Sequence, residues 1–450
     1  LLVSDGPEAS TGLGGQSKLL FEAATAAGWH VTLANLCLGP PHFPPRFFHA
    51  QGMVPTYLVD TPIPPDSAGY ILDEVRPDAV LALCDPWMLG ALPTYRGVTN
   101  KLHLWTTCDH EIFPDSFRTM FESCASLVFM ADFGARSWGP LVKRNKPGQR
   151  TLTIPHAVDG ELFRILKPEE GPARFRAQYG IEGYFVALHV GRNSWRKQQP
   201  LLIEGWARFV ESLPEAECAK VLLYLHTEEQ SAPTIRAGDD PVTNLYAALY
   251  SGWNLPKYLE RNYSEQVRGT IRFSRREIPK QALVGMYNVA DVHVLTSFGE
   301  GFGVPLIEAQ ACGRANIAAD NTTTPEIVGG EPCSEAAVPL AGFGSKAFAV
   351  WEHEARGEGA PFGYRVPCNS FQVQPDFSGK RPLVDCDALA AALLDAHRLW
   401  RRGCDNEGFS LNAPEATERR RAWTLARYGW PEVRAKWTEL LKQIREELPR

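Results

Sequence analysis

Two carboxylates lie eight positions apart around a glycine-rich turn, at Glu300 and Glu308. The apolar, β-prone segment 291–297 before them predicts a buried parallel strand. Pro305 and Gly313 suit the first position and the end of a short helix that follows the turn. The free N–H groups at the start of such a helix stabilise an anion, and carboxylates accept hydrogen bonds from vicinal hydroxyls. The spacing therefore predicts a site for a diphosphate that carries a sugar. The alternative is a solvated turn carboxylate followed by a helix-surface one.

A second segment upstream carries cations in the same kind of position. Residues 184–190 read as a buried strand that ends at Gly191, and Arg192 and Lys197 follow before a helical run over 200–210. Cations at the carboxyl end of a parallel strand suit phosphate. The alternative is a basic loop exposed to solvent.

Together these two segments resemble the retaining glycosyltransferases of family 4, which have the two-domain GT-B fold. That family carries two glutamates separated by seven residues in a Gly-Phe-Gly setting, and a Gly-Arg pair separated by four residues from a lysine. The resemblance implies that Glu300 contacts the donor sugar, Glu308 binds the ribose hydroxyls, and Arg192 and Lys197 hold the diphosphate. It assigns the adjoining backbone to donor binding at Gly301, Phe302, Gly303 and Val304. The glycine that commonly follows the lysine is Gln198 in this chain.

The N-terminal segment 11–17 partly matches a dinucleotide-binding fingerprint. It predicts a turn from Thr11 to Gly15 and a helix from Gln16. A nicotinamide oxidoreductase would require an acidic residue about twenty positions later, where the second predicted strand ends in Ala-Asn-Leu. The resemblance explains the glycines differently, because it places Gly14 and Gly15 opposite the donor diphosphate. The alternative is an ordinary turn between strand and helix.

The resemblance also directs attention to the end of the predicted strand 102–106. Many family members have a His-Asp pair there, whereas this chain has Cys-Asp-His, so Asp109 and then His110 are the candidate groups nearest the reacting centre. Asp85 follows another predicted strand and is a weaker candidate for orienting the acceptor. Each of these residues is also a reasonable turn or capping residue.

The mechanism implied by the resemblance is retaining transfer from a nucleotide-diphosphate sugar to an acceptor hydroxyl. Cations and helix N–H groups would stabilise the leaving diphosphate, so no metal and no further cofactor is expected. The pair Asp385 and Asp387 mimics a metal-binding Asp-x-Asp motif. It directly precedes a predicted helix over 388–400, and we interpret it as a helix start.

Composition limits the classes of partner. The chain has 450 residues, 44% of them hydrophobic, which favours two globular domains. A formal net charge of −6 argues against strong sequence-independent nucleic-acid binding. The 10 cysteines are scattered without a Cys-x-x-Cys pair, which suits a cytoplasmic protein without a zinc site. No apolar run is long enough to span a bilayer, so any membrane contact is expected to be peripheral.

The expected fold class is α/β, with two Rossmann-like domains facing each other across a cleft. The predicted N-terminal, acceptor-binding domain covers 1–166, and the donor-binding domain covers 167–428. Within the latter, about 330–382 reads as an irregular insertion. The segment 429–450 reads as an amphipathic helix, and the resemblance to GT-B proteins implies that it crosses back onto the N-terminal domain.

Three other functions remain open at this stage. The oxidoreductase leaves both charged pairs unexplained. A sugar-nucleotide epimerase or hydrolase would use the same phosphate site without an acceptor, and a non-catalytic module would bind the donor without turnover. The nucleobase, the sugar, the linkage and the oligomeric state are not determined by the sequence, and neither is the acceptor, whether a glycan, a lipid-linked glycan or a small molecule.

Overall fold

The computed structural model describes residues 1–448 except 8, 10, 11, 38–45, 51–53, 147, 232–251, 275–277, 330–336, 340–347, 351–361, 375–378 and 406–409. The chain divides into two compact units, one formed by Leu1–Ala157 with Arg427–Arg450 and the other by Val158–Ala426. Each unit has a largely parallel sheet of eight strands. Two α/β units of this kind make up a GT-B fold, which confirms the predicted fold class.

The first unit orders its strands β3-β4-β2-β1-β5-β6-β7-β8, and only β3 runs antiparallel to its neighbour. Its strands are β1 (Leu2–Ser4), β2 (Leu33–Cys37), β3 (Arg46–Ala50), β4 (Val54–Asp60), β5 (Val80–Cys84), β6 (Leu102–Thr106), β7 (Ser126–Phe129) and β8 (Arg150–Thr153). Its α-helices are α1 (Gly12–Ala26), α2 (Pro65–Val75), α3 (Arg118–Ser123), α4 (Asp132–Ser137), α5 (Gly139–Asn145) and α17 (Trp430–Glu446). Strands β5 and β6 are fully buried, as their continuous apolar sequences predict.

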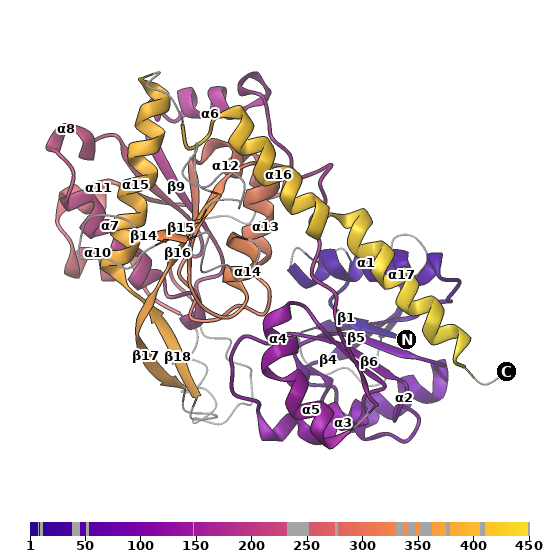
Figure 1. Ribbon diagram of the computed structural model, residues 1–450. Helices are drawn as coiled ribbons and strands as arrows, with labels where there is room; N and C mark the ends of the chain where they lie inside the picture. The colour runs from indigo at the N-terminus through magenta and orange to yellow at the C-terminus, as the bar shows by residue number, and fades with distance from the viewer. Residues whose placement is uncertain are drawn as a thin grey trace. The chain divides into compact units, whose positions relative to one another are not determined.

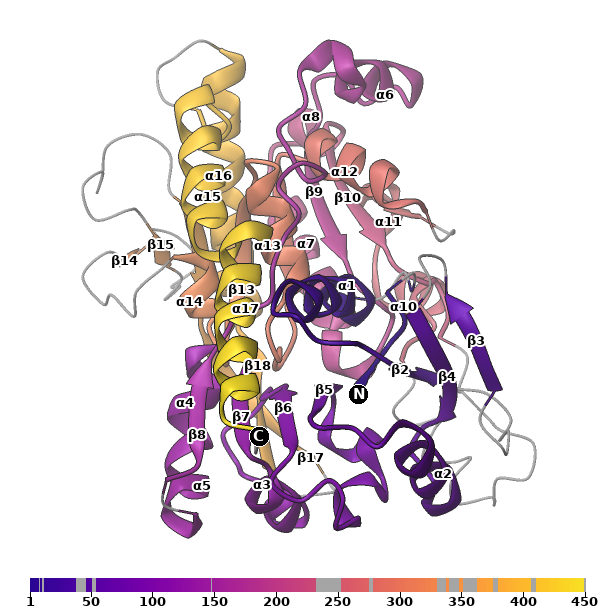
Figure 2. The same ribbon diagram turned by 90° about the vertical axis from the view of Figure 1, so that its right-hand side faces the viewer.

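The last helix, α17, packs on the first unit beside α1 (Figures 1 and 2). Its apolar stripe is buried, and the ring of Trp437 lies 4.8 Å from the ring of Trp105 between centroids. The indole N–H of Trp29 donates to the carbonyl of Leu441 at 3.0 Å. The segment forms the helix that its amphipathic pattern predicts, and it packs on the first unit as the resemblance implies.

The start of α1 differs from the prediction. We expected a turn over Thr11–Gly15, but α1 begins at Gly12, so Gly14 and Gly15 are helical. The reason is visible at Gly14, where a Cβ atom would stand 2.5 Å from the carbonyl oxygen of Ala9. Glycine is needed at this position because the preceding loop passes close to the helix.

The second unit orders its strands β11-β10-β9-β12-β13-β16-β15-β14. The strands are β9 (Phe185–Val190), β10 (Val221–His226), β11 (Ile271–Phe273), β12 (Val292–Leu295), β13 (Ala315–Ala319), β14 (Ala337–Pro339), β15 (Phe348–Val350) and β16 (Gly363–Val366), with a separate hairpin of β17 (Cys368–Gln374) and β18 (Gly379–Val384). The helices are α6 (Pro172–Gln178), α7 (Gln199–Glu211), α8 (Glu215–Cys218), α10 (Leu255–Asn262), α11 (Glu265–Gly269), α12 (Lys280–Val289), α13 (Val304–Ala311), α14 (Thr324–Val328), α15 (Cys386–Cys404) and α16 (Pro414–Tyr428). Strands β9 and β12 are parallel neighbours, with Val292 opposite Ala187.

The strand order reverses between β9 and β12, since the chain runs outward from β9 to β11 and then returns to β12. Ligands of open α/β sheets bind outside the carboxyl ends of the strands at such a reversal. The segments after β9 and β12 are the two that carry the charged motifs.

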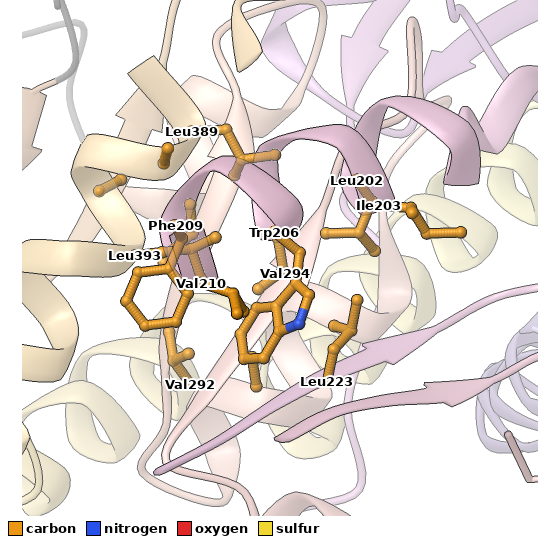
Figure 3. Packing of buried hydrophobic residues seen from close by; sticks show 14 of the residues in the cluster. Leu202, Ile203, Trp206, Phe209, Val210, Leu223, Val292, Val294, Leu389 and Leu393 are labelled. Atoms are coloured by element: carbon orange, nitrogen blue, oxygen red, sulfur yellow. The ribbon is translucent and has the colours of Figure 1, made fainter. Parts of the chain in front are cut away.

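The core of the second unit fixes this edge of the sheet. Helices α7 and α15 pack side by side against buried strand residues, and Trp206 of α7 lies at the centre of that cluster (Figure 3). The indole N–H of Trp206 donates to the hydroxyl of Thr270 at 2.8 Å, so the buried indole keeps a polar partner. Close packing of these large buried side chains holds β9 and β12 in place.

The range about 330–382 contains regular structure where it is described. Strand β16 pairs with β13 in parallel, and β17 pairs with β18 in a hairpin. The sequence hides these strands because β17 exposes alternate apolar and polar residues instead of a buried run. Within the described parts of the chain, no helix has both the length and the hydrophobicity needed to cross a membrane.

Candidate functional site

The two charged segments of the second unit meet at the reversal of its sheet. The backbone N–H of Phe298, after β12, donates to the carbonyl of Arg196, after β9, at 3.1 Å. The guanidinium of Arg196 donates in turn to the carbonyl of Gly299 at 2.6 Å. The glycine-rich turn is therefore held to the basic loop by both backbone and side-chain bonds.

Glu300 is the centre of a compact charge cluster. Its Oε1 accepts hydrogen bonds at 2.5 Å from the ammonium of Lys197 and at 2.5 Å from the hydroxyl of Ser297. Its Oε2 lies 2.7 Å from the guanidinium of Arg196. The side chains of Lys197 and Glu300 are 9% and 6% exposed, so they form a buried ion pair. The additional contacts from Ser297 and Arg196 help to satisfy the buried carboxylate.

The charges in this cluster support one another. Burial by itself would raise the pKa of Glu300, but Arg196 and Lys197 outweigh burial and hold that pKa well below its ordinary value. Burial lowers the pKa of Lys197, and the neighbouring Glu300 opposes that shift. Glu300 is thus a stable anion between two cations, which leaves the cluster one positive charge.

The turn between Glu300 and helix α13 leads into the start of that helix through a left-handed glycine. Gly303 precedes the helix with φ of +98°, a left-handed conformation that suits glycine. Pro305 is the second residue of α13, and Gly313 ends it with φ of +77°. The hydroxyl of Thr323 donates to the carbonyl of Phe302 at 2.8 Å, which holds the turn from the side of α14.

Gln198 occupies the position at which the family commonly has glycine. Its φ of +53° and ψ of +42° are left-handed, and its side-chain amide donates to the carbonyl of Trp195 at 2.9 Å. Gln198 therefore stands where the family pattern has glycine, but its backbone has a left-handed conformation that glycine favours. The side-chain hydrogen bond offsets part of the steric cost.

Arg192 differs from the other basic residues of the loop. Its side chain is exposed, whereas Lys197 is buried against Glu300. The carbonyl of Arg192 accepts a hydrogen bond from the amide of Gln199 at 2.8 Å, so its backbone is fixed to the start of α7. The structure thus places Lys197 and Glu300 together and leaves Arg192 at the surface of the same loop.

Glu308 lies on α13, in its second turn, as expected. It does not belong to the Glu300 cluster. Instead, its Oε2 accepts a hydrogen bond from the hydroxyl of Tyr287 at 2.9 Å. Burial raises the pKa of Glu308 to about 7, although Tyr287 and Lys280 act in the opposite direction. The two motif carboxylates therefore differ in charge state near neutral pH.

The candidate residues of the first unit follow β5 and β6. One carboxylate oxygen of Asp85 accepts a hydrogen bond from the hydroxyl of Thr107 at 2.6 Å. Asp85 precedes a short 3₁₀ helix, Pro86–Leu89, but makes no side-chain cap there. Asp109 keeps 29% of its side chain exposed, whereas the ring of His110 is buried and lies 5.1 Å from the ring of Trp138. Asp109 is thus the more accessible of the two.

The interpretation of the Asp385 motif as a helix start is confirmed. The side chain of Asp385 accepts hydrogen bonds from the backbone N–H groups of Asp387 at 2.9 Å and Ala388 at 3.0 Å, at the first turn of α15. This is an N-cap. Among the residues that the structure describes, no group of three or more His, Cys, Asp or Glu side chains has the arrangement of a metal site.

Sequence reasoning assigned no role to Arg196, Ser297 or Tyr287, all of which contact the motif residues. Arg196 and Ser297 adjoin named residues, so their proximity in sequence was an available signal. Tyr287 lies 21 positions before Glu308, and no spacing rule joins them. Only the packing of α12 against α13 reveals this contact.

A protein family model matches the part of the second unit that carries the charged segments. Residues 185–341 match the family described as "Glycosyl transferases group 1". That range includes Arg192, Lys197, Glu300 and Glu308. These residues therefore lie within the segment that is similar to this family.

Curated relatives match part of the chain. The O-antigen chain mannosyltransferase B of Escherichia coli is 37% identical over 188 residues, which is 41% of this chain and 41% of that protein. A D-inositol 3-phosphate glycosyltransferase of Geodermatophilus obscurus is 29% identical over 172 residues, 38% of this chain and 33% of that protein. The matches thus cover less than half of these relatives.

Solved structures match over nearly the whole chain. A sucrose-phosphate synthase from Thermosynechococcus elongatus superposes with a TM-score of 0.62 at 17% identity, covering 99% of this chain and 98% of that one. An Anabaena protein crystallised with UDP and glucose gives a TM-score of 0.60 at 13% identity, with 98% of both chains covered. At these identities the likeness establishes the GT-B fold.

Proposed function

We propose that this protein is a retaining glycosyltransferase that moves a sugar from a nucleotide-diphosphate sugar to an acceptor hydroxyl without a metal ion. The observation that carries the proposal is the Glu300 cluster at the reversal of the second sheet. Two cations, a glycine-rich turn and a helix start lie together there, with the ribose candidate Glu308 on the same helix.

The donor would be held by complementary charge. The cluster of Arg196, Lys197 and Glu300 has a net positive charge, and Arg192 on the same loop adds another. A diphosphate supplies the missing negative charge, and the N–H groups of residues 302–304 add hydrogen bonds at the start of α13. Since these groups can neutralise the leaving diphosphate, the chemistry requires no metal at this step.

The roles of the two carboxylates follow from their surroundings. Glu300 is ionised and held by three donors, which suits a rigid acceptor of hydrogen bonds from the donor sugar. Glu308 would bind the vicinal hydroxyls of ribose. In retaining transfer the acceptor oxygen forms its bond to the anomeric carbon as the bond to the diphosphate breaks on the same face. The diphosphate leaves with the bonding electrons and receives the acceptor proton.

In the first unit, Asp109 is the proposed polar group nearest the reacting centre, with His110 second, and Asp85 would orient the acceptor. The exposure of Asp109 supports this order, because a group that meets an incoming acceptor must be accessible. Gly14 and Gly15 would face the donor diphosphate. The acceptor is proposed to be a glycan, a lipid-linked glycan or a small hydroxylated molecule, met in the cytoplasm or at the membrane surface.

Thermal-shift screening of GDP-, UDP- and ADP-sugars in the presence of EDTA tests this proposal, and mannose donors come first because mannosyltransferases are among the relatives. A donor that stabilises the protein is then followed for slow release of its nucleoside diphosphate. Stabilisation with release of the free sugar in the α-configuration is the expected result for an α-linked donor. A rearranged sugar nucleotide would indicate an epimerase. Binding of the donor without release of nucleoside diphosphate, even with added acceptors, would indicate a binding module. If no donor bound, the proposal would be contradicted.

A further inference from the structure

Buried Tyr287 and partly buried Glu308 form a hydrogen-bonded pair that does not share a contact with the Glu300 cluster among the described residues. The hydroxyl of Tyr287, on α12, donates to Oε2 of Glu308, on α13, at 2.9 Å. The tyrosine ring is fully buried, and it lies 6.2 Å from the ring of Phe163 and 5.8 Å from the ring of His293 between centroids. Packing on both sides leaves the ring one orientation, so the hydroxyl points at the carboxylate in a fixed direction.

The hydrogen bond from Tyr287 occupies Oε2 of Glu308 and leaves Oε1 available to another donor. Among the described residues, Tyr287 is the hydrogen-bond donor to Glu308, and it reaches only Oε2. The residue keeps part of its surface accessible. A carboxylate that is anchored through one oxygen presents its second oxygen in one direction, which reduces the entropy lost when a ligand binds.

We propose that Tyr287 is a positioning residue for the nucleotide: its hydroxyl fixes the Glu308 carboxylate so that Oε1 meets the ribose hydroxyls. This inference rests on the proposed function of the site. Tyr287 itself does not touch the ligand, so it acts on affinity through Glu308. Its loss should therefore weaken nucleotide binding while leaving the rate at saturating donor nearly unchanged.

The positioning role of Tyr287 should be measurable in the pH dependence of nucleotide affinity, because of the titratable and charged groups around Glu308. Burial raises the pKa of Glu308 to about 7, and Tyr287 and then Lys280, both of α12, lower it. Cys312 on α13 stays a neutral thiol because burial raises its pKa to about 12, in spite of the opposing charges of Arg314 and of Arg421 on α16. His293 on β12 stays neutral because burial lowers its pKa to about 3. Among Glu308, Cys312 and His293, Glu308 is therefore the group that titrates near neutral pH.

The sign of the pH effect follows from which form the ribose prefers. An ionised carboxylate accepts hydrogen bonds from hydroxyl groups more strongly than a protonated one, so affinity should rise as the pH passes through 7. Tyr287 also donates to the ionised form. Replacing its hydroxyl removes that support, raises the pKa of Glu308 further and moves the rise in affinity to higher pH.

The test compares Tyr287→Phe with the wild type by calorimetric titration of UDP, GDP and ADP between about pH 6 and pH 9. The matched control is Tyr364→Phe, because Tyr364 is also fully buried in the second unit and its hydroxyl donates to a carboxylate oxygen of Asp395 at 3.0 Å. Both variants lose one buried hydroxyl bonded to a carboxylate, and both rings keep their packing.

We expect Tyr287→Phe to weaken binding of the preferred nucleoside diphosphate about tenfold at pH 7, with less loss at pH 9. It should also reduce the preference for the ribonucleotide over its 2′-deoxy form, whereas Tyr364→Phe should change neither quantity. An unchanged pH profile and an unchanged ribose preference in Tyr287→Phe, with wild-type binding intact, would overturn the inference and leave the proposed function standing. Failure of the wild type to bind any of the three nucleotides would instead overturn the proposed function, and this inference with it.

Discussion

The polar residues of the two units are held in different ways. In the second unit, Glu300 is buried and bonded by Lys197, Arg196 and Ser297 within 2.7 Å. In the first unit, Asp109 keeps 29% of its side chain exposed, and the nearest ring nitrogen of His110 lies 4.0 Å from its carboxylate. Glu300 is therefore fixed in its geometry before any ligand arrives, whereas Asp109 is partly open to solvent.

This difference suits two different tasks. A nucleotide donor has the same diphosphate and ribose whichever sugar it carries, so a rigid, preorganised site costs little in versatility and gains affinity. The acceptor hydroxyl must approach, react and leave. Under the proposed function, we infer that the preorganised cluster of the second unit serves the donor and that the exposed Asp109 of the first unit stays accessible to an acceptor.

The largest expected effect comes from breaking the buried pair in the second unit. Lys197→Ala leaves the Glu300 carboxylate buried with one fewer cation, which should lower the free energy of unfolding of that unit by about 3 kcal/mol. Urea unfolding monitored by tryptophan fluorescence measures this. Arg208→Ala is the control, because Arg208 is partly exposed where it pairs with Glu204 on α7 and Asp387 on α15, and its loss should cost about 1 kcal/mol. Equal losses in the two variants would show that the cluster is not preorganised.

The second effect sharpens the comparison from the side of the first unit. Asp109→Asn preserves size and removes one exposed charge, so the free energy of unfolding should change by less than about 0.5 kcal/mol. Transfer to acceptor should nevertheless fall about a hundredfold, and the affinity for nucleoside diphosphate should stay the same. Steady-state kinetics and nucleotide titration test this together. A large loss of stability with normal transfer would assign Asp109 to the fold instead of the chemistry.

The third effect concerns the pH dependence of stability that Glu308 introduces. Its folded pKa of about 7 lies above the ordinary value of 4.5, so the native state binds more protons than the unfolded state between these values. Stability from this group is therefore complete below about pH 4.5 and is lost as the pH rises through 7. The loss should amount to about 2 kcal/mol after allowance for its partial exposure. Subtracting the unfolding free energies of Glu308→Gln from those of the wild type at each pH isolates this contribution from the buried histidines, and a flat difference would contradict it.

The smallest effect tests the backbone of the basic loop. Gln198 has a left-handed conformation with φ of +53°, so Gln198→Gly should relieve steric cost but lose the bond to Trp195, for a net stabilisation of about 0.5 kcal/mol. Asn100→Gly in the first unit provides the comparison, because Asn100 has φ of +59° and asparagine tolerates this region better. Thermal unfolding should show a gain for Gln198→Gly that exceeds that for Asn100→Gly. Marked destabilisation by Gln198→Gly would show that the side-chain bond dominates.

How much could be predicted from the sequence depended on how local the signal was. The strand, turn and helix around Glu300 and Glu308 were predictable because each is specified by neighbouring residues, such as Pro305 and Gly313. The α17 stripe was predictable for the same reason. The beginning of α1 was not, because it depends on the close approach of the Ala9 carbonyl to Gly14.

In the candidate site, too, the features specified by neighbouring residues were predictable and those set by packing were not. Spacing predicted that the basic loop and the glycine-rich turn would meet, since their strands end at one edge of the sheet. It did not predict that Arg196, one place before Lys197, would bridge to Glu300 and Gly299, or that Tyr287 would anchor Glu308. Those contacts are set by side-chain direction and by the packing of helices, which no short pattern encodes.

The most direct test of the central claim is to compare Glu300→Ala with Glu308→Ala in nucleotide affinity and in donor turnover. The account predicts that Glu308→Ala weakens nucleoside diphosphate binding at least tenfold, because ribose contacts are lost. It predicts that Glu300→Ala keeps or strengthens that binding, because Lys197 and Arg196 lose their internal partner, while turnover of the sugar donor falls about a hundredfold. Equal loss of binding and turnover in both variants would contradict the assignment of one carboxylate to the sugar and the other to the ribose.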